Sequence, residues 1–146
     1  MAPSPPVDPA LAALVVKDGV ALGGLSVAQR QLALALAWAG WPETPLTEAE
    51  VNEQLKSLLA SALCCLDTDH VELRRWLVDA GWLCRDGFGR QYRRTAVDAL
   101  PPACAPAAAA VAALDPAAFT AACRASRDAE RAARRQAWAA RGTTRT

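Results

Sequence analysis

The chain has 146 residues, 53% of them hydrophobic, and its 16 basic and 15 acidic side chains give a formal net charge of +1. This length fits one compact domain with tails, because about 100–150 residues is the commonest domain size. We expect a cytoplasmic protein without a membrane segment, since no long uncharged apolar run and no signal-like N-terminus are present. The basic charge is concentrated toward the C-terminus, where residues 101–146 hold 7 basic and 3 acidic side chains.

The first 25 residues predict little regular structure. Residues 1–9 are rich in proline and are expected to form a disordered lead. Residues 10–16 are expected to form a short helix, and the glycines in residues 17–25 indicate a turn or loop.

A central buried helix is predicted from Ser26 to about Gly40. Ser26 and Gln29 have the spacing of a capping box, in which each side chain bonds the other residue's backbone N–H. Leucines and Trp38 then follow on most sides of the helix, which indicates burial. Gly40 and the proline two residues later favour a stop there.

A second, amphipathic helix is predicted after Thr47. Thr47 and Glu50 form another capping box, and Leu46 and Val51 have the positions of a hydrophobic staple. Apolar residues then recur at helical spacing as far as Leu59.

The third helix is predicted to begin at a cap formed by Asp69 with Glu72, although Asp67 is also a suitable cap. Gly81 is expected to end this helix in the left-handed conformation. Residues 82–85 and 91–94 then flank a turn containing Gly87, which predicts a two-stranded hairpin.

Three helices followed by a hairpin predict a mainly α fold with a small β-hairpin, of the winged helix-turn-helix type. Residues 10–100 are expected to form this domain, with its core in residues 26–100. Residues 101–116 indicate a Pro/Ala linker. Residues 117–146 are expected to form a long Ala/Arg-rich basic helix and tail, capped by Asp115.

Three blocks of this sequence resemble a known family. LTEAEVNEQL (Leu46–Leu55), VELRRWLVDAGWLCRD (Val71–Asp86) and GRQYRR (Gly89–Arg94) are similar to the bacterial domain of unknown function 2087. The resemblance implies a winged-helix-like fold that occurs in or beside transcriptional regulators. It implies no biochemical activity, and the stretch between the first two blocks is longer than a standard helix-turn-helix turn.

Arginines are the candidate site residues. On the third helix they favour either phosphate contact or a structural ion-pair network, and at the hairpin either phosphate contact or solvation. On the last helix they recur in steps of three and four, which makes one basic stripe containing Trp138. The candidate DNA contacts are Arg74, Arg75, Arg90, Arg93, Arg94, Arg124, Arg127, Arg131 and Arg134.

Three functions remain open from the sequence, the last of them metalloid or redox sensing by Cys64 and Cys65. The first is a non-enzymatic DNA-binding protein of the transcription-regulator type. The alternative is a protein–protein interaction module, in which Trp76 or Trp82 and the alanine face of the C-terminal helix bind another protein. Oligomeric state, DNA sequence and ligand are not specified by any pattern.

No catalytic pattern is present, because the chain lacks a Ser/His/Asp arrangement and a phosphate-binding glycine loop. The five cysteines have no disulfide-framework spacing. Adjacent Cys64 and Cys65 near His70 lack the ligand spacing of structural zinc sites, so we expect small buried hydrophobes and neither metal nor cofactor.

Overall fold

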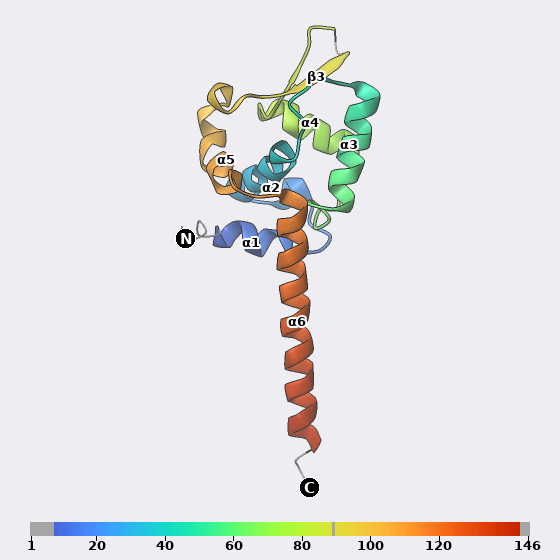
Figure 1. Cartoon of the computed structure of the whole chain (residues 1–146), viewed down its shortest axis with the longest axis vertical. Helices are drawn as coiled ribbons and strands as arrows, with labels where there is room; N and C mark the ends of the chain where they lie inside the picture. The colour runs from blue at the N-terminus through green and yellow to red at the C-terminus, as the bar shows by residue number, and fades with distance from the viewer. Residues whose placement is uncertain (1–7, 89, 144–146) are drawn as a thin grey trace.

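The computed structural model describes residues 8–88 and 90–143. These residues are mainly helical (Figure 1), and they also form three short strands and three 3-10 helices, which we label η. In chain order the elements are α1 (Pro9–Val15), η1 (Leu22–Gly24), α2 (Val27–Ala39), β1 (Leu46–Thr47), α3 (Glu48–Ala60), α4 (His70–Asp79), β2 (Leu83–Arg85), β3 (Gln91–Arg94), η2 (Val97–Ala99), η3 (Pro102–Cys104), α5 (Ala105–Val111) and α6 (Pro116–Thr143).

The helix starts follow the predicted caps. Both bonds of the capping box are present at Ser26 for α2 and at Thr47 for α3. At α4 the Asp69 carboxylate accepts the backbone N–H of Glu72 at 2.8 Å, but the Glu72 carboxylate accepts the hydroxyl of Thr68 at 2.6 Å. The cap at Asp69 is therefore confirmed, while the return bond of the third capping box is replaced by this side-chain bond.

The predicted hairpin is part of a three-stranded antiparallel sheet in the order β1-β3-β2. β2 and β3 pair as the sequence predicts, with Cys84 opposite Arg93. β1 adds Leu46 opposite Tyr92 on the other edge of β3. Two residues are too few to show an alternating pattern, so β1 was not predicted from the sequence.

The connection between α3 and α4 is tied to the N-terminal part of the chain. Val20 forms a parallel bridge with Leu66. The Val20 N–H donates to the carbonyl of Cys65 at 3.0 Å, and the Asp67 N–H donates to the carbonyl of Val20 at 2.8 Å. This long connection therefore has a fixed backbone.

The hydrophobic core is centred on α2 and is wider than the predicted range of residues 26–100. Leu11, Leu14 and Leu22 of the N-terminal segment are buried in it. Cys104 and Val111 enter it from the C-terminal side. The expectation of a core limited to 26–100 is therefore wrong.

The segment expected to be a Pro/Ala linker is largely helical and packed, so that expectation is also wrong. η3 and α5 occupy most of it, and α5 lies along α2 with Ala107 and Ala108 buried. Alanine has the highest helix propensity, and prolines in the first turn of a helix do not interrupt its hydrogen bonds. Composition alone did not separate this helix from an extended linker.

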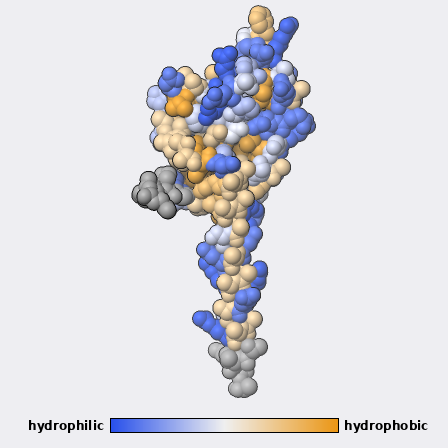
Figure 2. Space-filling view, viewed as in Figure 1, coloured by the Kyte–Doolittle hydropathy of each residue, from blue (hydrophilic) through white to orange (hydrophobic). Residues whose placement is uncertain are grey.

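The long C-terminal helix is confirmed as α6, which begins at Pro116 after the Asp115 cap. Its N-terminal part packs on α1 and α2, and the rest projects away from the body (Figure 1). Figure 2 shows the projecting part as a narrow column of pale apolar surface with blue hydrophilic side chains beside it.

Among the described residues, no single helix has both the length and the apolar character needed to cross a membrane.

Candidate nucleic-acid interface

The exposed side of α4 and the hairpin form one surface, which we term the α4–hairpin surface. α4 buries Leu73 and Leu77 in the core and leaves the opposite side open. This open side and the hairpin enclose a shallow hollow of about 240 Å³. The hollow is lined by Glu48, Val71, Arg74, Arg75, Val78, Asp79, Arg85 and Tyr92. Exposed Arg90 extends the surface to the turn of the hairpin, and exposed Arg93 projects from the other face of the hairpin, beside a hollow lined in part by Pro45 and Cys84.

Arg74 is half-buried and joins three elements. Its Nη1 donates to the Asn52 side-chain oxygen at 3.0 Å and to the Glu48 carboxylate at 3.4 Å, both on α3. Its guanidinium also lies over the Tyr92 ring of β3, at 5.9 Å from the ring centre. The contacts of Arg74 therefore agree with the interpretation of this arginine as part of a structural ion-pair network, since it joins α4 to α3 and to the hairpin.

Arg75 differs from its neighbour, because it is exposed and has no ion pair with any described residue. It lies one residue further round the helix, where the side chain leaves the α3–α4 contact. Asp79, which also lines the hollow, is four residues later on the same side of α4. Arg75 is the cation of α4 that is free to contact an anionic ligand.

The hairpin contributes three exposed arginines: Arg85, Arg90 and Arg93. Hydrogen bonds fix the turn, because the backbone N–H of Arg90 donates to the Asp86 carboxylate at 2.8 Å and the backbone N–H of Asp86 donates to the carbonyl of Gln91 at 3.0 Å. Successive side chains of a strand point to opposite faces, so Arg93 is exposed while Arg94 is directed inward.

Arg94 is part of the internal structure. Its Nε donates to the carbonyl of Trp38 at 2.8 Å, and its guanidinium lies 3.9 Å from the centre of the Trp38 ring. The Trp38 indole N–H in turn donates to the carbonyl of Thr95 at 2.8 Å. These bonds fix the end of β3 against the end of α2.

Arg124 and Arg127 attach α6 to the end of α1. Arg124 donates to the carbonyls of Val15 and Lys17 and to the Asp18 carboxylate, at 3.1, 2.9 and 2.5 Å respectively. Arg127 donates to the carbonyl of Val16 and forms an ion pair with Asp18. The hydrogen bond from Arg124 holds the pKa of Asp18 below its ordinary value. The carbonyls at a helix C-terminus favour such cations.

Arg131 and Arg134 are exposed on α6 and face the loop after α1. α6 leaves the body at the end opposite to the hairpin (Figure 1). The sequence-predicted site residues other than internal Arg94 therefore lie in two separate places. The α4–hairpin surface holds Arg74, Arg75, Arg90 and Arg93, while Arg124, Arg127, Arg131 and Arg134 belong to α6.

Sequence reasoning missed several residues of the α4–hairpin surface. Arg85 is an arginine like the candidates on the hairpin, and its residue type is the one sequence feature that could have identified it. Glu48 and Asn52 are on α3, and no local pattern links them to Arg74. Their bonds to Arg74 join positions 26 and 22 residues apart, which only the folded chain reveals.

The burial of the tryptophans decides which of them could bind another protein. Trp82 is fully buried, and its indole N–H donates to the Gln31 side chain at 2.8 Å. Trp76 is partly buried beneath the guanidinium of Arg30, at 4.4 Å from the ring centre. Trp82 is therefore unavailable to a partner, contrary to the sequence-based hypothesis, and the exposed tryptophan is Trp138.

The fold and this surface define a small, mainly helical protein with a three-stranded antiparallel sheet and an appended long helix. Residues 27–94 match the model of a family described as uncharacterised proteins conserved in bacteria, DUF2087. The resemblance found in the three sequence blocks is thereby confirmed, and the matched segment extends from the start of α2 to the end of β3. No curated protein and no solved structure matches the chain.

Proposed function

We propose that this protein is a winged helix-turn-helix protein that binds DNA through the α4–hairpin surface. The observation that carries the proposal is the element order α2-β1-α3-α4-β2-β3 together with the sheet order β1-β3-β2. In a helix-turn-helix protein the second helix of the pair enters the major groove, and α4 has that position here. The hairpin lies beside α4, as a wing does.

The charges of the α4–hairpin surface support the proposal. Five arginines lie on α4 and the hairpin (Arg74, Arg75, Arg85, Arg90 and Arg93), and Arg93 projects from the face of the hairpin opposite to Tyr92. They are accompanied by three carboxylates, Glu48, Asp79 and Asp86. Glu48 is already paired with Arg74. Because phosphate neutralisation by arginine supplies much of the affinity for DNA, exposed Arg75 and Arg93 are the residues we expect to contact the backbone.

A salt titration of DNA binding tests this function. Fluorescence anisotropy with a random-sequence duplex would be measured for the natural chain, for the double variant Arg75→Ala/Arg93→Ala, and for Arg134→Ala as a control with the same type of charge removed from α6. We expect the double variant to bind more weakly and its log–log salt slope to be shallower by about 0.9 for each lost phosphate contact. The control is expected to retain most of the binding.

If Arg134→Ala lost as much DNA affinity as the double variant, or more, the DNA contact would have to be assigned to α6. No binding by the natural chain, even at low salt, would contradict the proposal as a whole.

A second candidate is contact with another protein through the projecting part of α6, favoured by Trp138. This residue is 77% exposed, which is unusual for a large aromatic group. Sedimentation velocity tests the simplest partner, a second copy of this chain. Association that Trp138→Ala removes would support this candidate, whereas a monomer at every concentration would contradict association with a second copy.

A further inference from the structure

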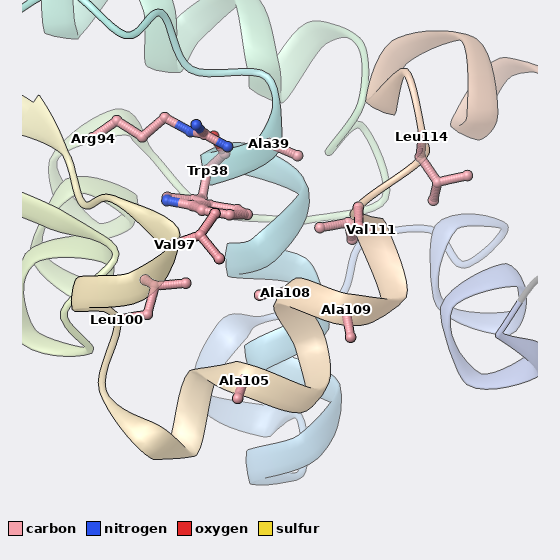
Figure 3. A pocket seen from close by; sticks show the side chains of 11 residues that line it. Trp38, Ala39, Arg94, Val97, Leu100, Ala105, Ala108, Ala109, Val111 and Leu114 are labelled. Carbon is pink, nitrogen blue, oxygen red and sulfur yellow. The ribbon is translucent and has the colours of Figure 1, made fainter.

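A cavity of about 360 Å³ lies between the end of α2, the segment after β3, and α5 (Figure 3). Trp38 and Arg94 form one side of it, with the guanidinium stacked over the indole ring. Val97 and Leu100 come from η2 and its end, and α5 supplies a row of alanines. The cavity lies apart from the α4–hairpin surface, because none of its lining residues is shared with that hollow.

The lining is almost entirely apolar, with one charge. Besides Trp38 and Arg94, it consists of Ala39, Val97, Leu100, Ala105, Ala108, Ala109, Val111, Ala112 and Leu114. No carboxylate is among these residues, so the positive charge of Arg94 is not neutralised within the cavity. An apolar cavity with one fixed polar group is typical of small-molecule sites.

Arg94 is held in place and still has donors to offer. Its Nε is bonded to the carbonyl of Trp38 at 2.8 Å, and the ring beneath restrains the guanidinium plane. Its two terminal nitrogens have no hydrogen-bond partner among the described residues. The planar guanidinium presents such nitrogens as a fork that matches a carboxylate.

We propose that this cavity binds a small molecule that has an apolar body and one carboxylate, with the carboxylate on Arg94 and the body against η2 and α5. A phosphate monoester fits less well, because it carries nearly two charges and the lining supplies a single cation. The volume is near the lower end of the range of about 300–1,000 Å³ for ligand pockets, which favours a ligand of few atoms.

Hexanoate and hexanamide make a matched pair of probes, since they share one shape and only hexanoate is charged. Each would be titrated into ¹⁵N-labelled protein, and the Trp38 indole N–H signal would be followed by NMR. We expect hexanoate to bind roughly tenfold more tightly than hexanamide, because hydrogen bonds between charged groups are stronger than neutral ones.

Three variants locate the binding. Arg94→Gln keeps an amide donor but removes the charge, and is expected to abolish the preference for hexanoate. Arg93→Gln, the adjacent exposed position on β3, is the control and is expected to keep the preference. Ala109→Leu adds volume at an exposed cavity-lining position of a helix, and is expected to weaken both probes.

Equal affinity for hexanoate and hexanamide in the natural chain would overturn the assignment of a carboxylate ligand. No change at the Trp38 indole with either probe would overturn the site itself. These two results need no variant, so the proposal stays testable if Arg94→Gln fails to fold.

Discussion

Arg93 and Arg94 are adjacent on β3 but have opposite surroundings. Arg93 is exposed on the hairpin, and Arg94 is bonded to Trp38 at the end of α2. Trp38 also contacts Trp82, with ring centres 5.4 Å apart, and donates to the carbonyl of Thr95. At the residue scale, the pleat of one strand therefore separates an arginine that is exposed on the hairpin from one that stabilises the fold and lines the cavity beside α5.

This difference predicts that two neighbouring substitutions affect different properties of the protein. Arg94→Ala should lower the free energy of unfolding by about 1–3 kcal/mol, because it removes a charged hydrogen bond and a cation–π contact. Arg93→Ala should change it by less than about 0.5 kcal/mol while weakening DNA binding. Urea unfolding and DNA anisotropy of both variants check this. Equal stabilities would contradict the structural role of Arg94.

Thiol reactivity should also depend on burial, and it should differ between Cys65 and Cys84. Burial raises the pKa of Cys65 to about 11, and the neighbouring Cys64 adds to this, whereas Cys84 is exposed. A thiol-labelling reagent at neutral pH should therefore modify Cys84 quickly and Cys65 only after unfolding. Mass spectrometry of the labelled peptides checks this, and fast labelling of Cys65 in the folded protein would contradict it.

The raised pKa also gives a pH dependence with a defined sign. The folded protein holds the Cys65 proton more tightly than the unfolded chain, whose ordinary value is 9.0. The contribution of the protonated Cys65 thiol to the free energy of unfolding is therefore fully present below pH 9.0, and it is lost as the pH rises through about 11. The free energy of unfolding of the natural chain, measured with urea, should fall above pH 9. A Cys65→Ser variant should show a smaller fall over the same pH range.

At the element scale, α4 ends at a position that requires glycine. Gly81 has φ of 88°, and a Cβ built on it would lie 2.5 Å from Cγ of Pro101. The Trp82 N–H then donates to the carbonyl of Leu77 at 2.9 Å, which directs the chain into β2. The angle between α4 and the hairpin therefore depends on this residue.

Gly81→Ala should destabilise the protein by at least about 2 kcal/mol, since the left-handed conformation alone costs about 1–2 kcal/mol and the contact with Pro101 adds to it. Gly87→Ala is the matched control, because no described atom lies within 4 Å of the added Cβ. Thermal unfolding of both variants checks this. A tolerated Gly81→Ala would mean that the junction of α4 and the hairpin is not constrained.

Sequence reasoning was most accurate where the determinants are local. The caps at Ser26, Thr47 and Asp69 are set by residues three positions apart, and all three were predicted correctly. The helical state of residues 105–111 was missed, because alanine and proline there fit either a linker or a helix until α2 provides a surface to pack on.

The candidate site was harder to predict than the fold elements. Arginine type and spacing located the candidates, but not their partners. Arg124 bonds to carbonyls 107 and 109 residues earlier in the chain, and no sequence period contains that information. Arg94 was likewise grouped with Arg93, although alternation along the strand separates them.

At the scale of the whole molecule, we expect the body to be stable without the projecting part of α6. The hydrogen bonds and ion pairs between α6 and the body extend to Arg127, and α5 is an integral part of the core. A chain that stops after Asp128 should therefore keep the unfolding temperature of the natural protein. A chain that stops after Leu100 should not fold, because Cys104 and Val111 leave the core. Circular dichroism melting of both chains checks this, and a stable chain ending at Leu100 would contradict the role of α5.

NMR mapping tests the central claim, DNA binding through the α4–hairpin surface, most directly. A short duplex would be titrated into ¹⁵N-labelled natural protein at low salt, and the backbone amide shifts would be followed along the chain. We expect perturbations concentrated in α4, β2 and β3, with residues 129–142 little changed. Perturbations confined to α6, or no perturbation at any duplex concentration, would contradict it.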